Sequence, residues 1–341
     1  MIKKYIAVIV IVFLSFNTNA QNISDLFSSL DSSVVVIRTI ESKTKGQGNA
    51  NDKVSYGALG SGVLVSKDGK ILTAAHVVNN ADEIEVYFKN GQVMKAKIEG
   101  LSRIADIAVI KTMGLIKDPK PAKMGDSDKS RIGDEVMIIG SPMGLEHSLS
   151  VGYISRKETQ QGHSSNFKKM EFFQTDAAIN TGNSGGPMFN MNGEVIGIVS
   201  SILSRSGGFE GIGFVATINI IKDLLINQSN NWIGVDVFYL YGPLAMAFNV
   251  PQDGAVLIEN VAKNSPAYFM GLKGGFANIS LEDQNITIGG DIVLGIDNKK
   301  FDNPDNVEDA VKYLNSLKKG QTYLLKILRA GQIIDIKWTV R

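Results

Sequence analysis

A serine in a glycine-rich turn is the residue of this chain whose surroundings are best suited to covalent chemistry. Ser184 lies in the stretch GNSGGP, residues 182–187. Glycine reaches backbone angles that are closed to other residues, so such a turn can expose a hydroxyl and direct neighbouring N–H groups toward one point. This arrangement stabilises the oxyanion that forms in acyl transfer. The simpler alternative is a glycine-rich surface turn between two strands.

A nucleophilic serine needs a histidine base and an acid that orients the histidine. The spacing G-x-S-x-G around Ser184 also fits the serine turn of α/β-hydrolases, whose acid and histidine follow the serine in the chain. The chain has three histidines, at positions 76, 147 and 163, and none follows Ser184. The order of residues therefore excludes the α/β-hydrolase arrangement and leaves the order histidine, aspartate, serine.

Two upstream residues complete that order. His76 lies in KILTAAHVV, at the end of an apolar run, and Asp106 lies in SRIADIAVIK, at the start of one. Each residue alone is more often structural, the histidine near a core and the aspartate in a turn. Together they predict a triad in which His76 is the base and Asp106 orients it. The backbone N–H groups of Gly182 and Ser184 are then the predicted oxyanion hole.

The stretches TAAHVV, ADIAVIK and TDAAINTGNSGGPMFN resemble the trypsin-like serine proteases of the HtrA group, which includes DegP-like and DegS-like members. The resemblance extends over residues 25–341. It implies a serine endopeptidase that acts on misfolded or exposed polypeptides without ATP. Thr181 departs from the pattern, since many members have proline or a basic residue there, and we expect it to tune the loop without abolishing the chemistry.

The same resemblance suggests a substrate preference. In trypsin-like proteases, the residue six positions before the serine lies at the floor of the primary specificity pocket, and here this residue is Ala178. An alanine carries no charge to pair with lysine or arginine. We therefore expect a small aliphatic residue before the scissile bond. The alternative is that Ala178 is simply packed and that other loops shape the pocket.

Short β-type runs predict a mainly β protease domain. Runs such as EIEVYF and VMKAKIEG flank an Asn-Gly turn, which is a strong hairpin signal. Many such strands at even spacing favour a barrel or sandwich, and the resemblance specifies a trypsin-like double β-barrel. The polar segment 41–56 is interpreted as a flexible loop. A helix near residues 219–227 is expected to end the domain.

The last part of the chain, residues 232–341, has a mixed pattern that resembles a smaller α+β PDZ domain. Helical spacing predicts a helix over residues 307–318, and a small insertion is expected near 276–289. A PDZ domain binds the C-terminus of a peptide beside an edge strand. The residues predicted to bind it are Trp232, Ile233, Gly234, Val235 and Val237. The alternative is an ordinary edge strand.

The beginning of the chain has the pattern of a secretory signal peptide. A short basic start precedes an apolar run over residues 5–16, followed by small residues up to Ala20. We therefore expect export, most simply to a periplasm, with a retained membrane anchor as the less favoured alternative. The predicted domains are a signal peptide at 1–20, a protease domain at 21–227 and a PDZ domain at 232–341.

Composition limits the partners that we expect. The chain has 35 basic and 34 acidic residues and no long basic run, so nothing favours nucleic-acid binding. It has no cysteine, no clustered histidines and no H-E-x-x-H motif, so we expect neither a metal nor another cofactor. The expected partners are unfolded polypeptides and C-terminal peptides.

Assembly and regulation are predicted from the family resemblance. HtrA proteases form trimers through the N-terminal segment, here near residues 21–32, with Phe27 and Leu30 as apolar candidates for the contact. The loop Arg156 to Lys169 is the candidate relay between the PDZ domain and the catalytic turn, and the alternative is a passive surface loop. Two alternatives to a general protease remain. They are a peptide-binding or chaperone-like protein and a DegS-like stress-sensing regulatory protease.

Overall fold

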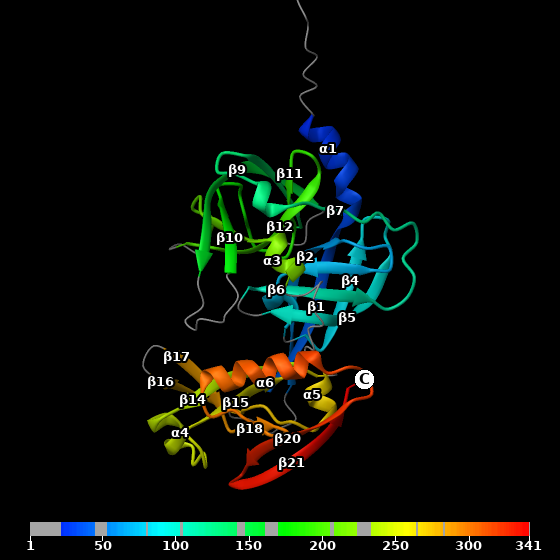
Figure 1. The fold of residues 1–341 in the computed structure, drawn as a ribbon. Helices are drawn as coiled ribbons and strands as arrows, with labels where there is room; N and C mark the ends of the chain where they lie inside the picture. The colour runs from blue at the N-terminus through cyan, green and yellow to red at the C-terminus, as the bar shows by residue number, and fades with distance from the viewer. Residues whose placement is uncertain are drawn as a thin grey trace, which may run out of the picture.

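A computed structural model describes most of the chain and shows two β-barrels above a C-terminal domain (Figure 1). The described residues are 22–44, 53–79, 81–102, 105–141, 147–160, 170–204, 208–223, 233–263, 265–281 and 284–340. The predicted signal peptide lies outside the described residues. The mainly β, double-barrel architecture confirms the fold class predicted from the short strands.

The first barrel is a closed ring of strands in the order β1-β2-β3-β6-β5-β4. Its strands are β1 (Val34–Thr44), β2 (Lys53–Leu64), β3 (Lys70–Thr73), β4 (Glu83–Phe88), β5 (Val93–Ser102) and β6 (Ile107–Thr112). Alternation explains the inward face, because every second residue of β4 is buried. Gly91, at φ 81°, forms the predicted hairpin turn between β4 and β5.

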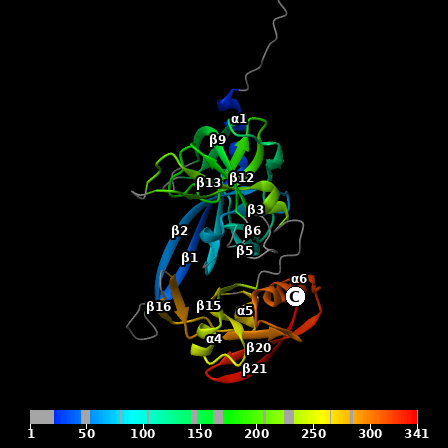
Figure 2. The ribbon, with the colours of Figure 1, turned by 60° about the vertical axis from the view of Figure 1, so that its left-hand side comes forward.

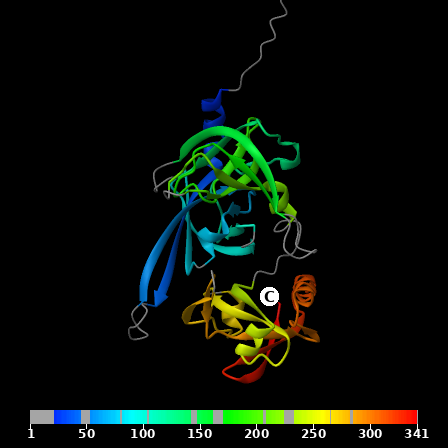
Figure 3. The same cartoon turned by 90° about the vertical axis from the view of Figure 1, so that its left-hand side faces the viewer.

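The hairpin of β1 and β2 extends beyond the barrel. The two strands pair without interruption from Val34 opposite Val63 to Thr44 opposite Lys53. Figures 2 and 3 show this pair as a blue arm that reaches down toward the level of the C-terminal domain. The prediction of a loop over residues 41–56 was therefore wrong at both of its ends, and residues 45–52 lie outside the described part.

The second barrel is formed by the later strands of the protease region. Its sheet has the order β11-β8-β9-β10-β13-β12-β7, and the additional pairing of β11 with β12 closes it. The strands are β7 (Lys123–Met124), β8 (Glu135–Gly140), β9 (Ser148–Gln160), β10 (Met170–Thr175), β11 (Pro187–Asn190), β12 (Glu194–Ile202) and β13 (Gly213–Thr217). The glycine-rich turn at Ser184 lies between β10 and β11.

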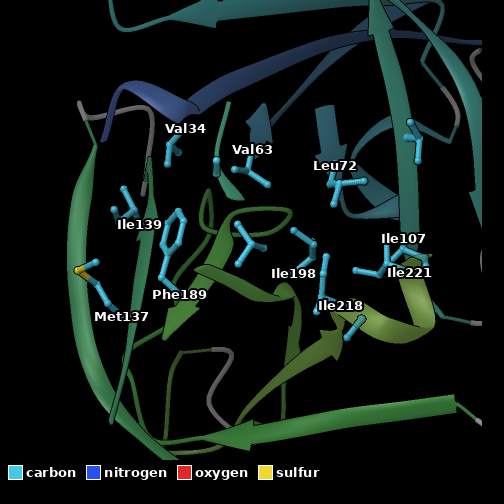
Figure 4. Close-up of a cluster of buried hydrophobic side chains, with 14 of the residues drawn as sticks. Val34, Val63, Leu72, Ile107, Met137, Ile139, Phe189, Ile198, Ile218 and Ile221 are labelled. Atoms are coloured by element: carbon cyan, nitrogen blue, oxygen red, sulfur yellow. The ribbon is translucent and has the colours of Figure 1, made fainter. Parts of the chain in front are cut away.

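One hydrophobic cluster joins the two barrels. Figure 4 shows Val34, Val63 and Leu72 of the first barrel on the same cluster as Phe189 and Ile198 of the second. All of these side chains are at most 1% exposed, so the seam between the barrels is shielded from solvent as fully as the barrel interiors. A site placed at this seam is therefore supported from both sides.

Short helices complete the protease region. They are α1 (Ile23–Leu30), the 3-10 turn η1 (Asp31–Ser33), α2 (Ala75–Val78), η2 (Ser127–Lys129) and α3 (Ile218–Ile221). Phe27 and Leu30 of α1 are half-buried against the cluster that joins the barrels. These predicted trimer contacts thus pack partly within their own chain. The helix predicted over residues 219–227 begins at Ile218, one residue before the predicted start. The last predicted residues, 224–227, lie outside the described part.

The C-terminal domain combines a curved sheet with three helices. The sheet has the order β14-β15-β18-β20-β21, with β19 paired to β18. The elements are β14 (Val235–Tyr241), α4 (Pro243–Ala247), β15 (Gly254–Val261), α5 (Pro266–Phe269), β16 (Ala277–Leu281), β17 (Gln284–Ile288), β18 (Ile292–Ile296), β19 (Lys299–Lys300), α6 (Pro304–Ser316), β20 (Thr322–Arg329) and β21 (Gln332–Thr339). The predicted insertion is a separate β16–β17 hairpin.

Helix α6 begins directly after its capping residue, Asn303. The Asn303 side chain accepts a hydrogen bond from the N–H of Asn306 at 2.9 Å, and Pro304 occupies the first turn. Val307 and Ala310 are buried against the sheet. The helix therefore covers residues 304–316, three residues earlier at its start than the range 307–318 expected from the sequence.

Two polar contacts connect the barrels to the C-terminal domain. Asn79 Nδ2 donates to both oxygens of the Asp236 carboxylate, at 3.4 and 3.5 Å. Lys263 Nζ lies 2.6 Å from Asp82 Oδ2. Asn79 directly follows α2, and its backbone N–H caps that helix at Ala75. The contact therefore joins the end of α2 to β14.

No helix in the described part of the chain has both the length and the apolar character needed to cross a membrane.

Candidate active site

His76 lies in α2, the short helix that follows β3 of the first barrel. Its neighbours Ala74 and Ala75 are at most 2% exposed, so only small residues fit under the helix. The His76 side chain itself is half exposed and lies at the seam. Sequence reasoning placed His76 at the end of a strand, whereas the chain has already left β3 there.

Asp106 holds the His76 ring. Its Oδ2 and Oδ1 lie 2.8 and 3.0 Å from His76 Nδ1, and Oδ1 also accepts the backbone N–H of His76 at 3.0 Å. With Nδ1 turned to the carboxylate, Nε2 is left for a second partner. Asp106 has φ 49°, in the left-handed region that aspartate tolerates better than most residues. A backbone held there by its surroundings is a frequent feature of functional sites.

Ser200, on β12, is a site residue that sequence reasoning missed. Its Oγ donates to Asp106 Oδ2 at 2.6 Å, and the side chain is 6% exposed. Burial acts to raise the pKa of Asp106, but the hydrogen bonds from His76 and Ser200 outweigh it and hold the pKa below its usual value of 3.8. A serine in the run IVSSI gives no local signal, since its partner lies 94 positions away.

Ser184 lies in a turn whose backbone is set by glycines. Gly182 and Gly185 have φ 105° and 82°, which a side chain would strain. Neither the N–H of Gly182 nor that of Ser184 donates a hydrogen bond to any group in the described residues. Two unpaired N–H groups on one turn are what an oxyanion requires. The structure thus leaves both predicted donors available.

Ser184 and His76 come from different barrels, which pack against each other at the seam. Both residues are described, and no hydrogen bond joins Ser184 Oγ to the His76 ring. Such bonds are often long before a substrate is bound. The backbone supports their approach, because the C=O of Ser184 accepts the N–H of Ser61 in the first barrel at 2.8 Å.

Ala178 is exposed, between the buried residues Ala177 and Ile179. The segment is fixed by Asp176, whose Oδ1 accepts the N–H of Tyr153 at 2.6 Å. Ala178 is therefore open to solvent next to the turn of Ser184. Its assignment to a specificity pocket stays a prediction.

The predicted relay segment differs from the expectation of a loop. Strand β9 extends to Gln160, which pairs with Met170 at the start of β10. Residues 156–160 are thus part of a β-ladder, and residues 161–169 lie outside the described part. The prediction of a loop that starts at Arg156 was wrong in its first part, because the strand pairing extends beyond the apolar alternation.

The residues predicted to bind a peptide lie beside an apolar groove. Val235, Val237 and Tyr239 of β14 face it, which is the alternation expected of a strand. The groove has a volume of about 220 Å³, and α6 forms its other wall with Val307, Ala310, Val311 and Leu314. Among the described strands β14 is at the edge of its sheet, so its outer backbone groups have no neighbouring strand there.

The loop before β14 presents free N–H groups at one end of the groove. Ile233 and Gly234 turn their carbonyls into the domain, where they accept the N–H groups of Ala267 and Ala262 at 2.8 and 2.9 Å. Within the described residues, the N–H groups of Ile233 and Gly234 donate no hydrogen bond. Gly234 has φ 82°, which favours glycine there. Trp232 lies outside the described residues.

The chain is similar in sequence to known proteases. Residues 60–198 match the family model of the trypsin-like peptidase domain. A "Probable periplasmic serine endoprotease DegP-like" of Pseudomonas savastanoi pv. phaseolicola is 39% identical over 267 residues, which cover 76% of this chain and 54% of that protein. A protein of the same description from Chlamydia trachomatis serovar D is 36% identical over 288 residues, 82% of this chain and 53% of its own. The chain spans about half the length of these relatives.

Solved structures agree with the sequence comparison. The HtrA-type protease AlgW with a decapeptide is 26% identical, with a TM-score of 0.52 over 93% of this chain and 97% of that chain. A variant of AlgW with a decapeptide is 27% identical, with a TM-score of 0.54 over 93% and 96%. By its sequence, its double barrel and the order of its site residues, this chain belongs to the trypsin-like serine proteases of the HtrA group.

Proposed function

We propose that the protein is a serine endopeptidase with Ser184 as nucleophile, His76 as general base and Asp106 as its orienting acid. The observation that carries this proposal is that the Asp106 carboxylate accepts hydrogen bonds from both the backbone N–H and Nδ1 of His76, which fixes the orientation of the ring. A serine hydroxyl is a weak nucleophile at neutral pH, so it requires such a base.

The reaction proceeds by two acyl transfers. His76 Nε2 takes the proton from Ser184 Oγ as this oxygen attacks the peptide carbonyl. The N–H groups of Gly182 and Ser184 stabilise the oxyanion, and His76 then gives the proton to the leaving amine. His76 then takes a proton from water as the water attacks the acyl-enzyme, and it returns this proton to Ser184 Oγ as the ester bond breaks. No step consumes ATP, because the hydrolysis of a peptide bond in water is itself favourable.

The proposed substrates are polypeptides in an unfolded or exposed state. The exposed position of Ala178 beside the turn supports a pocket that lacks charge at its floor and takes a small aliphatic side chain. Valine, alanine or isoleucine before the scissile bond fits this chemistry.

Digestion of casein and of an unfolded test protein tests the proposal. Purified protein is expected to cleave both, and Ser184→Ala, His76→Ala and Asp106→Asn are expected to lose nearly all cleavage while circular dichroism stays unchanged. Cleavage that persists in Ser184→Ala overturns the assignment. A folded wild type that binds unfolded protein but never cleaves it supports the chaperone-like alternative.

A second function is supported by the groove of the C-terminal domain. We propose that residues 232–341 form a PDZ domain that binds the C-terminus of a peptide as an additional strand on β14. The unpaired N–H groups of Ile233 and Gly234 fit the terminal carboxylate, and the apolar groove fits hydrophobic side chains. Trp232 remains a proposed member of this loop.

Fluorescence anisotropy of labelled peptides tests the binding. A peptide that ends in hydrophobic residues and a free carboxylate is expected to bind, and its C-terminal amide is expected to bind at least tenfold more weakly, since a charge-assisted hydrogen bond contributes about 1.5–3 kcal/mol. Val311→Asp, in the wall of the groove, serves as the variant. Equal binding of acid and amide contradicts carboxylate recognition.

We further propose that peptide binding regulates cleavage. The contact of Asp236 with Asn79 supports this, since Asp236 lies between the groove residues Val235 and Val237 while Asn79 follows the helix of His76. A hydrophobic C-terminal peptide is expected to change the cleavage rate of the full chain and to leave a chain truncated after residue 231 unaffected. The same response in both forms contradicts the coupling. Strict dependence on the peptide favours the DegS-like alternative.

Export and assembly complete the proposal. The relatives described as periplasmic support removal of residues 1–20 and a periplasmic location, which N-terminal sequencing of the mature protein tests. A homotrimer remains the proposed assembly. Light scattering at micromolar concentration tests it, and a monomer there excludes it.

A further inference from the structure

Ser61 lies in β2 of the first barrel and faces the turn of Ser184 in the second barrel. It is 0% exposed, so its hydroxyl must find partners within the protein. It belongs to none of the three residues proposed to carry the reaction. Its contacts nevertheless converge on the two residues proposed to bind the oxyanion.

Four hydrogen bonds fix Ser61 at the seam. Its N–H donates to the C=O of Ser184 at 2.8 Å, and its Oγ donates to the C=O of Gly182 at 2.6 Å. The same Oγ accepts the N–H of Ser141, at the end of β8, at 2.9 Å. The C=O of Ser61 accepts Thr73 Oγ1 at 2.7 Å. The hydroxyl thus uses its donor and an acceptor position on the second barrel.

These bonds determine how the peptide planes of the turn are oriented. The C=O of Gly182 and the N–H of Asn183 belong to one planar peptide and point in opposite directions. Ser61 Oγ holds the first, and the C=O of Asn180 accepts the second at 2.9 Å. This plane is therefore held at both edges. The N–H of Gly182 belongs to the preceding peptide plane, so it can turn relative to the fixed plane only about the two backbone bonds at the Cα of Gly182.

The second oxyanion donor is fixed in a similar way. The C=O of Asn183 accepts the N–H of Gly186 at 2.9 Å, so the N–H of Ser184 in the same peptide plane points away from it. The C=O of Ser184 is in turn held by the N–H of Ser61. One residue of the first barrel thus supports the peptide planes that follow both donors.

We propose that Ser61 is a positioning residue for the oxyanion hole, and that its hydroxyl sets the orientation of Gly182 from the opposite barrel. The proposal rests on the proposed endopeptidase function. The hydroxyl acts through the backbone of Gly182 and never touches the substrate. Removal of Oγ leaves the C=O of Gly182 and the N–H of Ser141 without this partner, but keeps the backbone bond to Ser184.

The test compares Ser61→Ala with a matched control, Ser33→Ala. Ser33 is 3% exposed, and its Oγ donates to the C=O of Leu30 at 2.6 Å, in the turn after α1. Both changes remove a buried hydroxyl that donates to a backbone carbonyl at the same distance. Kinetics with a peptide anilide give kcat and KM below both melting temperatures. The affinity for a peptide boronate, whose adduct with Ser184 places an oxygen in the oxyanion hole, gives a second readout.

We expect Ser61→Ala to lower kcat at least about tenfold, with KM changed less than about twofold, since loss of a whole oxyanion donor lowers kcat about 100- to 1000-fold. The boronate affinity is expected to fall by a similar factor. Ser33→Ala is expected to lower the melting temperature and leave both quantities unchanged. If Ser61→Ala does not fold, Ser61→Cys, which keeps the volume but forms weaker hydrogen bonds, takes its place with the same expectation.

A variant with normal kcat and normal boronate affinity overturns the proposal. So does a lowered melting temperature with unchanged boronate affinity, because the hydroxyl then serves only the packing of the seam. A wild type that does not hydrolyse the substrate or bind the boronate contradicts the endopeptidase function itself. The two failures are therefore distinguishable.

Discussion

Replacement of Ser200 by alanine tests whether the environment of Asp106 is tuned as the structure indicates. Ser200 Oγ donates to Asp106 Oδ2 at 2.6 Å, and the Asp106 side chain is 21% exposed. A hydrogen bond to a charged, largely buried group contributes about 1.5–3 kcal/mol. We therefore expect Ser200→Ala to lower the free energy of unfolding by about this amount at neutral pH.

The pH dependence follows from the lowered pKa of Asp106. A carboxyl whose pKa is lower in the folded than in the unfolded state adds stability above its ordinary value of 3.8, and this stability is lost as the pH falls through the folded pKa. Ser200→Ala removes one cause of the lowering, so the folded pKa rises. The deficit of the variant is therefore complete at pH 7 and shrinks as the pH falls through the folded pKa of the variant and then that of the wild type.

Calorimetry of both proteins between pH 7 and about pH 3 measures this deficit, with Ser33→Ala as the control. The hydroxyl of Ser33 donates to a neutral carbonyl, so its deficit is expected to be independent of pH. In kinetics, Ser200→Ala is expected to lower kcat by at most roughly 10- to 100-fold, since 1.36 kcal/mol of lost transition-state stabilisation is tenfold in rate. A deficit that is equal at pH 7 and pH 3 refutes the reasoning.

Three further predictions concern the turn, the contact between domains and the edge of the groove. Gly185→Ala is expected to give little soluble, active protein, because the added Cβ would lie 2.2 Å from Thr73 Oγ1. Gly91→Ala has a similar φ but nothing within 4 Å of the added Cβ, so it is expected to lower the free energy of unfolding, measured by denaturation, by only about 1 kcal/mol. Asp82→Lys is expected to speed limited proteolysis between the domains, because it removes the ion pair with Lys263. The double variant Asp82→Lys with Lys263→Asp is expected to restore the wild-type rate. An ion pair of this kind contributes only about 0–1 kcal/mol. Val237→Asp places a charge on the groove face of β14, so the variant is expected to lose affinity for the peptide in anisotropy. Its cleavage of casein without added peptide is expected to stay unchanged.

The sequence predicted the strands and the fold class well, for a local reason. Alternating burial in strands such as β4, and the Asn-Gly turn after it, are visible in a window of a few residues. His76 and Ser184 were also recognisable from their neighbouring residues, and their order in the chain excluded the α/β-hydrolase fold. The structure brings His76 and Asp106 into contact and places Ser184 at the same seam.

The failures occurred where strand pairing continues without an apolar pattern. Residues 41–44 pair with residues 53–56 outside the barrel, and residues 156–160 extend β9 as far as Gln160. Polar residues with no alternation resemble a loop when each segment is considered alone. The strand pairing continues there because the preceding residues already align the two strands. It therefore depends on the neighbouring strand, which the sequence of one segment does not show.

The same distinction explains which site residues the sequence could not reveal. Ser200 and Ser61 are ordinary serines within β-type runs, and each gains its role from a group on another part of the fold. The glycines of the turn belong to the same class, because Gly185 is required by the approach of Thr73 and Ser61 as well as by its own φ. A sequence shows which residues can act as base or nucleophile, whereas the residues that hold them in place are defined by contacts across the seam. Substitutions at this seam are therefore expected to affect catalysis without changing any catalytic side chain.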